Sequence, residues 1–231
     1  MSARKITTTV PIVTIISGDP VAAGLAKSLG HPGMNVTGVT YYATELTAKR
    51  LELLKQMLPA LQTVGILDNP AFTEVNPDLV SLPFKDDAQK AAQMLGLKTS
   101  VQSARQVEDL EAAIARMKAD GAEAVFVLPD LMFAAEAKRI ADLALAAKLP
   151  TMSWGEWFTR AGCLMSYAAD YGQMNRRLAF YVDRVLKGTK PGDLPIEQPS
   201  VFRLSINLKT AKSVGVEPPP SLMAMADTLI E

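Results

Sequence analysis

Residues Val10–Ala23 read V-P-I-V-T-I-I-S-G-D-P-V-A-A, and the order of residue types in this stretch indicates the class of fold. Ile12–Ile16 is an apolar, mostly β-branched run, typical of a strand buried on both faces, as parallel sheets require. Ser17–Asp19 contains two helix-capping residue types, so we predict a helix over 21–29. In open α/β sheets, small ligands bind at such a turn after a strand. Ser17–Asp19 is therefore either a ligand loop or an ordinary capped connection.

The composition is that of an ordinary globular protein. The 231 residues are 48% hydrophobic and 21% charged, and the formal net charge is zero. This length suits one large domain or two small ones. A balanced charge argues against a nucleic-acid partner, which would need a clustered basic face. No apolar run approaches the roughly 20 residues of a membrane span, and the polar start M-S-A-R-K-I-T-T-T is not typical of a secretory signal.

The sequence lacks the residue patterns of common enzymes. Cys163 and His31 are the only cysteine and histidine, which excludes disulfides and metal sites built on clusters of either residue. The motifs G-x-S-x-G, G-x-x-x-x-G-K-[ST] and G-x-G-x-x-G are absent. Cys163 lies in an apolar stretch, where we expect a buried, unreactive thiol. We therefore expect no catalytic residue, metal or cofactor, and an enzyme is the least favoured interpretation.

Strand-like and helix-like segments alternate along most of the chain. Such alternation predicts an α/β fold, with a parallel sheet that has helices on both faces. The predicted strands are 12–16, 35–40, 63–67, 98–102, 124–128, 151–153 and 162–167, and the segment 195–208 is extended. The predicted helices are 21–29, 45–58, 84–95, 107–119, 132–147, 171–186, 208–214 and 221–230. The first 58 residues hold only two strands and two helices, too few for a complete domain of this class.

Polar clusters follow the predicted strands of the middle part of the chain. The carboxyl ends of parallel strands lie along one edge of a sheet, so we expect these clusters to converge on a ligand. They are Asp68-Asn69, Ser100–Ser103, Pro129-Asp130 and Ser153–Glu156. Together with nearby aromatic residues they suit a zwitterion that has an apolar or aromatic side chain. For Trp154 and Trp157, packing over the core is an equally weighted alternative.

Several stretches, in this order, carry a family resemblance that covers Thr9–Glu231. They are I-S-G-D-P-V-A-A-G-L, H-P-G-M-N-V-T-G-V, E-L-T-A-K-R-L-E-L-L-K, L-P-D, V-L-K-G-T-K-P-G-D-L-P-I-E-Q-P and I-N-L-K-T-A-K-S-V-G-V-E-P-P-P-S-L. The sequence resembles the substrate-binding components of ABC importers of the tryptophan/tyrosine type. The resemblance implies a periplasmic-binding-protein type I fold, with two α/β lobes, crossover strands at the hinge and a ligand held in the cleft.

The same resemblance implies how the chain divides into lobes. Residues 1–58 and 168–192 are expected in lobe 1, and residues 59–167 and 193–231 in lobe 2. Family members carry further residues before the first strand seen here, namely a signal peptide or lipoprotein cysteine and the first strands and helices of lobe 1. We therefore expect an incomplete first lobe, whose exposed sheet edge and apolar surface favour self-association.

Carried over residue by residue, the resemblance also implies a ligand site. Its candidate residues are Ser17, Gly18, Asp19, Thr40 and Tyr41 in lobe 1, and Asn69, Asn76, Asp130, Ser153, Trp154, Glu156 and Tyr167 in lobe 2. By charge complementarity, Asp130 and Glu156 are candidates for binding a ligand ammonium group. The hydroxyl and N–H groups of Ser17–Gly18 suit a carboxylate. Trp154 and Tyr167 are candidates for stacking on the ligand side chain.

The expected function follows from the resemblance. It is the solute-binding component of an ABC importer, which takes up an aromatic or branched-chain amino acid or a similar small organic solute. Such a protein works in the periplasm or another extracytoplasmic space and passes its ligand to a membrane permease, without catalysis. The alternative is a cytosolic ligand sensor or a degenerate fragment with the same fold and no transport role, which the lack of a signal peptide favours.

Overall fold

The computed structural model describes residues 6–16, 19–40, 44–71 and 84–231. These residues form two compact units. Unit 1 contains the described residues up to residue 40 together with residues 169–202. Unit 2 contains residues 44–71, 84–168 and 203–231. Each unit is thus assembled from stretches that are far apart in the sequence.

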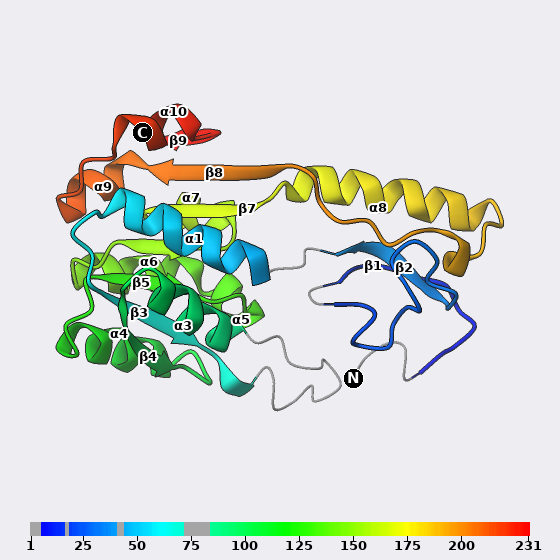
Figure 1. Cartoon of the computed structure of the whole chain (residues 1–231), viewed down its shortest axis with the longest axis horizontal. Helices are drawn as coiled ribbons and strands as arrows, with labels where there is room; N and C mark the ends of the chain where they lie inside the picture. Colours follow the sequence, from blue (N-terminus) through cyan, green and yellow to red (C-terminus); the bar gives the residue numbers. More distant parts are fainter. Residues whose placement is uncertain (1–5, 17–18, 41–43, 72–83) are drawn as a thin grey trace. The chain divides into compact units, whose positions relative to one another are not determined.

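Unit 2 is built on a seven-stranded sheet with the order β4-β3-β5-β6-β7-β8-β9 (Figure 1). Its strands are β3 (Thr63–Asp68), β4 (Lys98–Ser103), β5 (Ala124–Val127), β6 (Thr151–Ser153), β7 (Met165–Ala169), β8 (Phe202–Asn207) and β9 (Thr228–Ile230). The pairings of β3 with β4 and β5, of β5 with β6, of β6 with β7 and of β8 with β9 are all parallel. The predicted α/β class with a parallel sheet is confirmed.

Two groups of helices cover this sheet. They are α1 (Thr44–Met57), α3 (Phe84–Met94), α4 (Asp109–Ala119), α5 (Leu131–Ala135), α6 (Ala137–Ala146), α7 (Glu156–Ala161), α9 (Leu208–Val214) and α10 (Pro220–Met225). Helix α1 packs against α3 and α10, whereas α6 packs against α4, α7 and α9. All four residues of β5, A-V-F-V, are buried. Burial of a continuous apolar strand is what helices on both faces of a parallel sheet produce.

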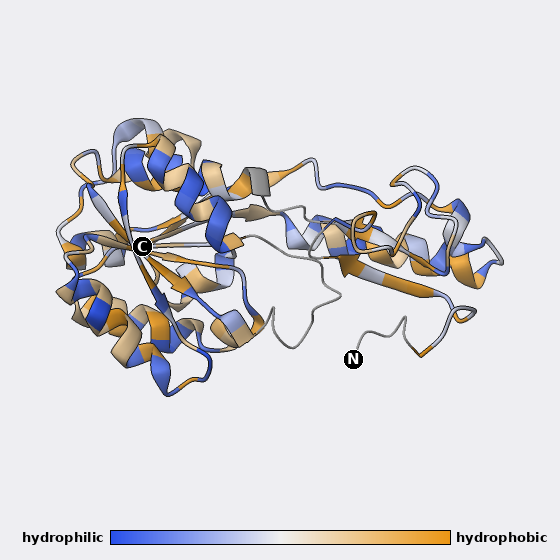
Figure 2. Cartoon of the chain, turned by 60° about the horizontal axis from the view of Figure 1, so that its bottom comes forward, coloured by the Kyte–Doolittle hydropathy of each residue, from blue (hydrophilic) through white to orange (hydrophobic). Residues whose placement is uncertain are grey.

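Unit 1 has a much smaller sheet, in which β1 (Ile12–Ile16) pairs in parallel with β2 (Val36–Thr40). Helix α8 (Tyr171–Leu186) contacts both strands, and the short 3-10 helix η2 (Pro191–Asp193) contacts β2. Side chains of β1 are divided between two small cores. Val13 and Ile15 pack with the α8 side, and Ile12 and Ile16 pack with the turns that follow β1. Figure 2 shows the hydrophobic colouring along β1.

The two units differ from the predicted lobes at two segments. Helix α1, which was predicted in lobe 1, packs against α3 and β6 of unit 2. Residues 193–202 were predicted in lobe 2, but they belong to unit 1, where they return along β2. There the Thr40 N–H donates to the Glu197 carbonyl at 2.8 Å, and the Glu197 N–H donates to the Gly38 carbonyl at 3.1 Å.

The predicted helix over residues 21–29 is wrong, because this segment forms turns. The N–H groups of Leu25 and Ala26 both donate to the Pro20 carbonyl, at 2.8 and 3.0 Å. Gly24 has a φ of +61°, and a right-handed helix does not continue through a left-handed residue. The turns nevertheless bury Ala26 against the sheet, as a helix would.

The last predicted helix, 221–230, is wrong in its second half. Helix α10 ends at Met225, and β9 follows because Asp227 joins this segment to β8. The Asp227 N–H donates to the Leu204 carbonyl at 2.8 Å, and its carboxylate accepts from the Leu204 N–H at 2.8 Å. The predicted helix 132–147 is two helices, α5 and α6, which meet at Glu136, where ψ is 18°.

Candidate functional site

The carboxyl ends of β3, β5, β6 and β7 carry most of the predicted site residues of unit 2. Asn69 follows β3, Asp130 lies three residues after β5 and Ser153 ends β6, whereas Tyr167 is the middle residue of β7. These four strands are consecutive in the sheet and parallel. The sheet therefore brings Asn69, Asp130 and Ser153 to one edge. Asn76 lies outside the described residues.

Asp130 is the most strongly held polar side chain at this edge. It is 7% exposed. Its Oδ1 accepts from the Phe133 N–H at 3.0 Å, which caps α5, and its Oδ2 accepts from the Asn69 side-chain amide at 3.1 Å. Asn69 in turn accepts from the Ala71 N–H at 3.1 Å. The result is a buried carboxylate whose orientation is fixed from two strands.

A second carboxylate, Asp68, lies beside this pair. Burial raises the pKa of Asp68, Lys85 opposes the rise, and the negative charge of Asp130 adds to it. A like charge nearby disfavours the ionised form of a partly buried carboxyl group. Asp68 therefore lies between the negative charge of Asp130 and the positive charge of Lys85.

Ser153 and Trp154 are more deeply buried than their predicted roles require. Ser153 is 0% exposed, and its hydroxyl donates to the Met165 carbonyl at 3.2 Å. Trp154 is 5% exposed and packs edge-on against Trp157, with ring centroids 4.9 Å apart. Phe158 completes this cluster. Within the described part of the chain, the Trp154 indole N–H has no hydrogen-bond acceptor, so one polar atom of this cluster has unused capacity.

Glu156 begins α7, a short helix that the sequence reasoning treated as a loop. Its carboxylate forms an ion pair with Arg160 one turn later on the same helix. The Glu156 side chain is 33% exposed, and the Arg160 side chain is 65% exposed. Exposed pairs of this kind are worth at most about 1 kcal/mol. Arg160 therefore competes only weakly with another cation for the Glu156 carboxylate.

Arg50 is a residue of this region that sequence reasoning missed. It is 2% exposed, and its Nε donates to the Tyr167 carbonyl at 2.7 Å. The spacing along α1 could have predicted this burial, because Arg50 lies four residues from both Leu46 and Leu54 on the buried face. Arginine is rarely buried on an apolar helix face without a partner, and here it holds the backbone of β7 at Tyr167.

In unit 1, two of the predicted residues are described. Asp19 Oδ1 accepts from the N–H groups of Val21 and Ala22, at 2.8 and 3.2 Å, so it caps the turns after β1. Thr40 is 1% exposed at the end of β2. Ser17, Gly18 and Tyr41 lie outside the described residues.

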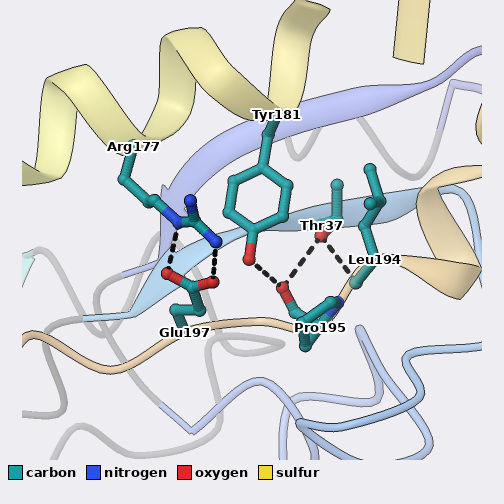
Figure 3. Close-up of polar contacts among 6 residues, drawn as sticks. All are labelled: Thr37, Arg177, Tyr181, Leu194, Pro195 and Glu197. Atoms are coloured by element: carbon teal, nitrogen blue, oxygen red, sulfur yellow. Dashed lines mark hydrogen bonds and ion pairs between the residues drawn. The ribbon is translucent and has the colours of Figure 1, made fainter. Parts of the chain in front are cut away.

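A polar network that the sequence did not reveal holds the segment after Leu194 onto unit 1 (Figure 3). Arg177 on α8 forms a two-pronged ion pair with Glu197, and its Nε lies 2.6 Å from Oε2. The Tyr181 hydroxyl donates to the Pro195 carbonyl at 2.6 Å, and the Thr37 hydroxyl donates to the Leu194 carbonyl at 2.9 Å. The network therefore connects α8, β2 and the returning chain.

The described residues contain no group of three or more His, Cys, Asp or Glu that could hold a metal ion. Cys163 is fully buried, as predicted, and burial raises the pKa of its thiol to about 12, which keeps it protonated and unreactive. Among the helices that the structure describes, none has the length and apolar character needed to cross a membrane.

A parallel sheet between helices, with polar and aromatic residues at the carboxyl ends of its strands, is the architecture of α/β ligand-binding proteins. The chain belongs to the ABC transporter substrate binding protein family, whose sequence model matches residues 2–230. The family resemblance inferred from the sequence is thereby confirmed.

Individual relatives agree with this assignment. A tyrosine-binding protein from Clostridioides difficile (strain R20291) is 26% identical over 219 residues, which are 94% of this chain and 60% of that protein. The chain thus spans about 60% of the length of this relative.

Solved structures confirm the predicted periplasmic-binding-protein fold. A conserved domain protein from Vibrio cholerae is 27% identical, with a TM-score of 0.86 over 98% of this chain and 73% of that one. An ABC domain from Streptococcus pneumoniae, in complex with L-Trp, is 24% identical, with a TM-score of 0.84 over 98% of this chain and 76% of that one.

Proposed function

We propose that this chain is the solute-binding component of an ABC importer and that its solute is an aromatic amino acid. The family match over residues 2–230 is the observation that carries the proposal. The choice of ligand is supported by a relative named tyrosine-binding and by a structural neighbour in complex with L-Trp. The zwitterion that the sheet-edge residues suit belongs to the same class of molecule.

Asp130 is proposed to bind the ammonium group of the ligand. Its two hydrogen bonds, from Phe133 and Asn69, use one lone pair on each carboxylate oxygen and leave the others available. The neighbouring Asp68 carboxylate adds negative charge, which favours a cation. Glu156 is the second candidate, but there the ammonium group would have to replace Arg160. Asp130 is the better partner because its carboxylate has no cation of its own among the described residues.

The aromatic side chain of the ligand is proposed to lie against Tyr167 and Trp154. Tyr167 is half-buried, and Arg50 holds its backbone through the carbonyl. The Trp154 ring is held by Trp157 and Phe158. Rigid aromatic walls favour a flat apolar side chain because little conformational freedom is lost on binding.

The carboxylate of the ligand is proposed to bind in unit 1, at the Ser17 hydroxyl and the Gly18 N–H. Asp19 belongs to the same loop and is held by its bonds to Val21 and Ala22. The remaining predicted contacts, Thr40, Tyr41, Asn76 and Ser153, complete the proposed site. Ser153 would act through the backbone that its hydroxyl braces, since its side chain is 0% exposed.

Proteins of this family typically work outside the cytoplasm and pass their ligand to a membrane permease. We propose both properties for this chain, and a role in binding without catalysis. A cytosolic sensor with the same fold would bind the same ligand, so the two roles separate only on delivery. If the chain is the transport component, membrane vesicles that contain the permease should take up the ligand only when the chain is added. If it is a sensor, adding it should leave this uptake unchanged.

Calorimetric titration of the purified chain with L-Trp, L-Tyr and L-Leu tests the proposal. We expect L-Trp or L-Tyr to bind more tightly than L-Leu. In Asp130→Asn the shape is kept and the charge is lost, so affinity should fall at least about thirtyfold. Asp142→Asn is the matched control, because Asp142 is an exposed carboxylate on α6 that is paired with Lys138.

The outcomes of this titration are distinct. A folded chain that binds none of the three amino acids contradicts the proposed function. Binding that Asp130→Asn leaves unchanged contradicts only the role of Asp130. Circular dichroism and the fluorescence of Trp154 and Trp157 report whether unit 2 of each variant is folded.

A further inference from the structure

A hollow of about 340 Å³ lies on unit 2, at the amino ends of β3 and β5. These strands are parallel, and Asn69 and Asp130 follow them, so the hollow and the candidate amino-acid site are at opposite ends of the sheet. The volume is within the range of about 300–1,000 Å³ that is usual for ligand sites. Its lining comes from the end of α1 and the next turn, from the residue before β5 and from the segment after α9, namely residues 57–61, Glu123 and residues 215–217. All of these residues belong to unit 2.

The most buried residues of the lining are apolar. Met57 and Leu61 are each 2% exposed, and Leu58 and Val216 are partly buried. Small-molecule sites typically combine such an apolar surface with a few polar groups of fixed orientation. The lining therefore suits the apolar part of a small molecule.

One carboxylate of the lining has a fixed orientation. Oε2 of Glu123 accepts from the N–H groups of Gln62 and Thr63, at 2.6 and 2.9 Å. These two bonds lower the pKa of Glu123, and the charge of Lys55 lowers it further, so the carboxylate is ionised at neutral pH. Among the described residues, the other oxygen, Oε1, has no hydrogen-bond or ion-pair partner. Glu123 is thus held at one oxygen and able to accept a donor at the other.

The rest of the lining adds negative charge and contributes no cationic side chain. Glu217 is a second, exposed carboxylate, and the hollow begins at the C-terminus of α1, the negative end of the helix dipole. Pro59 has no N–H, so the Lys55 carbonyl in the last turn of α1 lacks the usual donor four residues later. Lys55 is near Glu123, but its Nζ donates to the Leu61 carbonyl. Two carboxylates and a helix C-terminus outweigh this single charge, so the hollow favours a cation.

We propose that this hollow binds a small organic cation, namely an ammonium group on a short apolar chain. The ammonium group donates to Oε1 of Glu123, with Glu217 nearby, and the apolar chain lies against Met57, Leu61 and Val216. A free amino acid fits less well, because its carboxylate would face two like charges. The hollow is thus a second site, with a specificity of its own, and this inference is independent of the proposed function.

Nuclear magnetic resonance titration of the whole chain with n-pentylamine, in the presence of excess L-Trp, is the first test. We expect the amides of Gln62, Thr63 and Val216 to shift until they saturate. Pentanoate, which has a chain of the same length and the opposite charge, should leave them unchanged. Absence of shifts at these amides, or equal shifts with pentanoate, overturns the proposal. Shifts confined to the Phe133 amide, beside Asp130, also overturn it.

A pair of variants gives the second test. Glu123→Gln removes the charge but keeps an oxygen that is able to accept the two N–H groups. The affinity for n-pentylamine should fall at least about tenfold, because the ammonium group loses its charged acceptor. Glu111→Gln is the matched control, since Glu111 is an exposed carboxylate in the first turn of α4. This variant should bind as the wild-type chain does, and equal affinities in all three chains overturn the proposal.

The fold of each variant is checked at the strand that follows Glu123. The Val125 amide donates to the Pro150 carbonyl at 2.8 Å, and its slow hydrogen exchange shows that unit 2 remains folded. If Glu123→Gln unfolds unit 2, the comparison of n-pentylamine with pentanoate on the wild-type chain decides.

Discussion

Unit 2 and unit 1 both start from parallel strands, but they are stabilised in different ways. In unit 2, seven strands lie between two groups of helices, and the largest buried side chains include Phe126, Phe133 and Phe158. In unit 1, two strands have a small core on each face, and the returning chain is held to β2 and α8 by the Arg177–Glu197, Tyr181–Pro195 and Thr37–Leu194 contacts.

This difference predicts which contacts carry the stability of each unit. Apolar burial in a large sheet is spread over many residues, so one polar contact matters little there. A two-stranded sheet has little apolar area to bury, and a few polar contacts carry a larger share of its stability. We therefore expect unit 1 to open before unit 2, and the following predictions test that difference.

The largest effect is expected in the core of unit 2. Phe126 on β5 is 1% exposed, and Phe126→Ala should lower the stability of unit 2 by about 3–5 kcal/mol. Both tryptophans lie in unit 2, so their fluorescence reports its unfolding in denaturant. The exchange rate of the Thr37 amide in unit 1 should stay unchanged. A change there would show that the two units unfold together.

The next effect concerns a glycine of β2. Gly38 has a φ of +144°, and a Cβ at this position would lie 1.9 Å from the Thr14 carbonyl oxygen. Gly38→Ala should therefore separate β1 from β2 and destabilise unit 1 by at least about 3 kcal/mol. Limited proteolysis within residues 12–40 measures this change.

Gly65 on β3 is the matched control for Gly38. A Cβ there would lie 2.7 Å from Sδ of Met117, a flexible side chain that is able to move, and the φ of Gly65 is not in the left-handed region. Gly65→Ala should cost about 1–2 kcal/mol and affect only unit 2. Equal losses of stability in Gly38→Ala and Gly65→Ala would contradict the idea that β2 has no room to adjust.

A smaller effect is expected from the polar network of unit 1. Tyr181→Phe removes the hydrogen bond to the Pro195 carbonyl and should destabilise unit 1 by about 1 kcal/mol. Faster exchange of the Thr40 amide, which is bonded to Glu197, would detect this change. In unit 2, Thr159→Val removes the bond to the Ser166 hydroxyl and serves for comparison. A larger loss in unit 2 would contradict the proposed difference.

The smallest effect is a pH dependence of opposite sign in the two units. The hydrogen bonds from Arg177 lower the pKa of Glu197 below its ordinary value of 4.5. Its contribution to unit 1 is therefore complete above pH 4.5 and is lost as the pH falls through the lowered value. Burial raises the pKa of Asp68 in unit 2, so protonation there favours the folded state as the pH falls.

Hydrogen exchange followed from about pH 6 down to about pH 3 separates these two contributions. Glu197→Gln should flatten the acid loss of unit 1, and Asp68→Asn should remove the opposing contribution in unit 2. An acid loss in unit 1 that persists in Glu197→Gln would contradict the role of this ion pair.

Much of the fold could be predicted from local residue patterns. Strands lie where Ile12–Ile16 and residues 124–128 predict them, but the predicted burial is complete only in β5, since the first four residues of β1 are partly exposed. The helix predicted over residues 21–29 failed because Gly24 takes a left-handed conformation that a capping pattern does not reveal. The final helix failed because the pairing of Asp227 with Leu204 overrides its local preference.

That several candidate residues lie at one edge of the sheet could be predicted, but their contacts could not. Parallel strands place Asn69 and Asp130 at one edge whatever their side chains do, and the two prove to be hydrogen-bonded. That Ser153 is completely buried depends on the packing of β6 against β7, which no spacing shows. Arg50 was missed because a single charged residue on an otherwise apolar helix face does not by itself predict a buried side chain.

The bond between Thr37 and Leu194 joins residues 157 positions apart, and this has a consequence for how the chain is synthesised. At typical ribosomal rates of about 5–20 residues per second, roughly 8–30 s pass between the emergence of β2 and that of the residues that complete unit 1. During this interval the whole of unit 2 emerges except β8, α9, α10 and β9. Until then the Thr40 N–H and the Gly38 carbonyl of β2 lack their partner, Glu197, so unit 1 completes this side of its sheet only after most of unit 2 has been made.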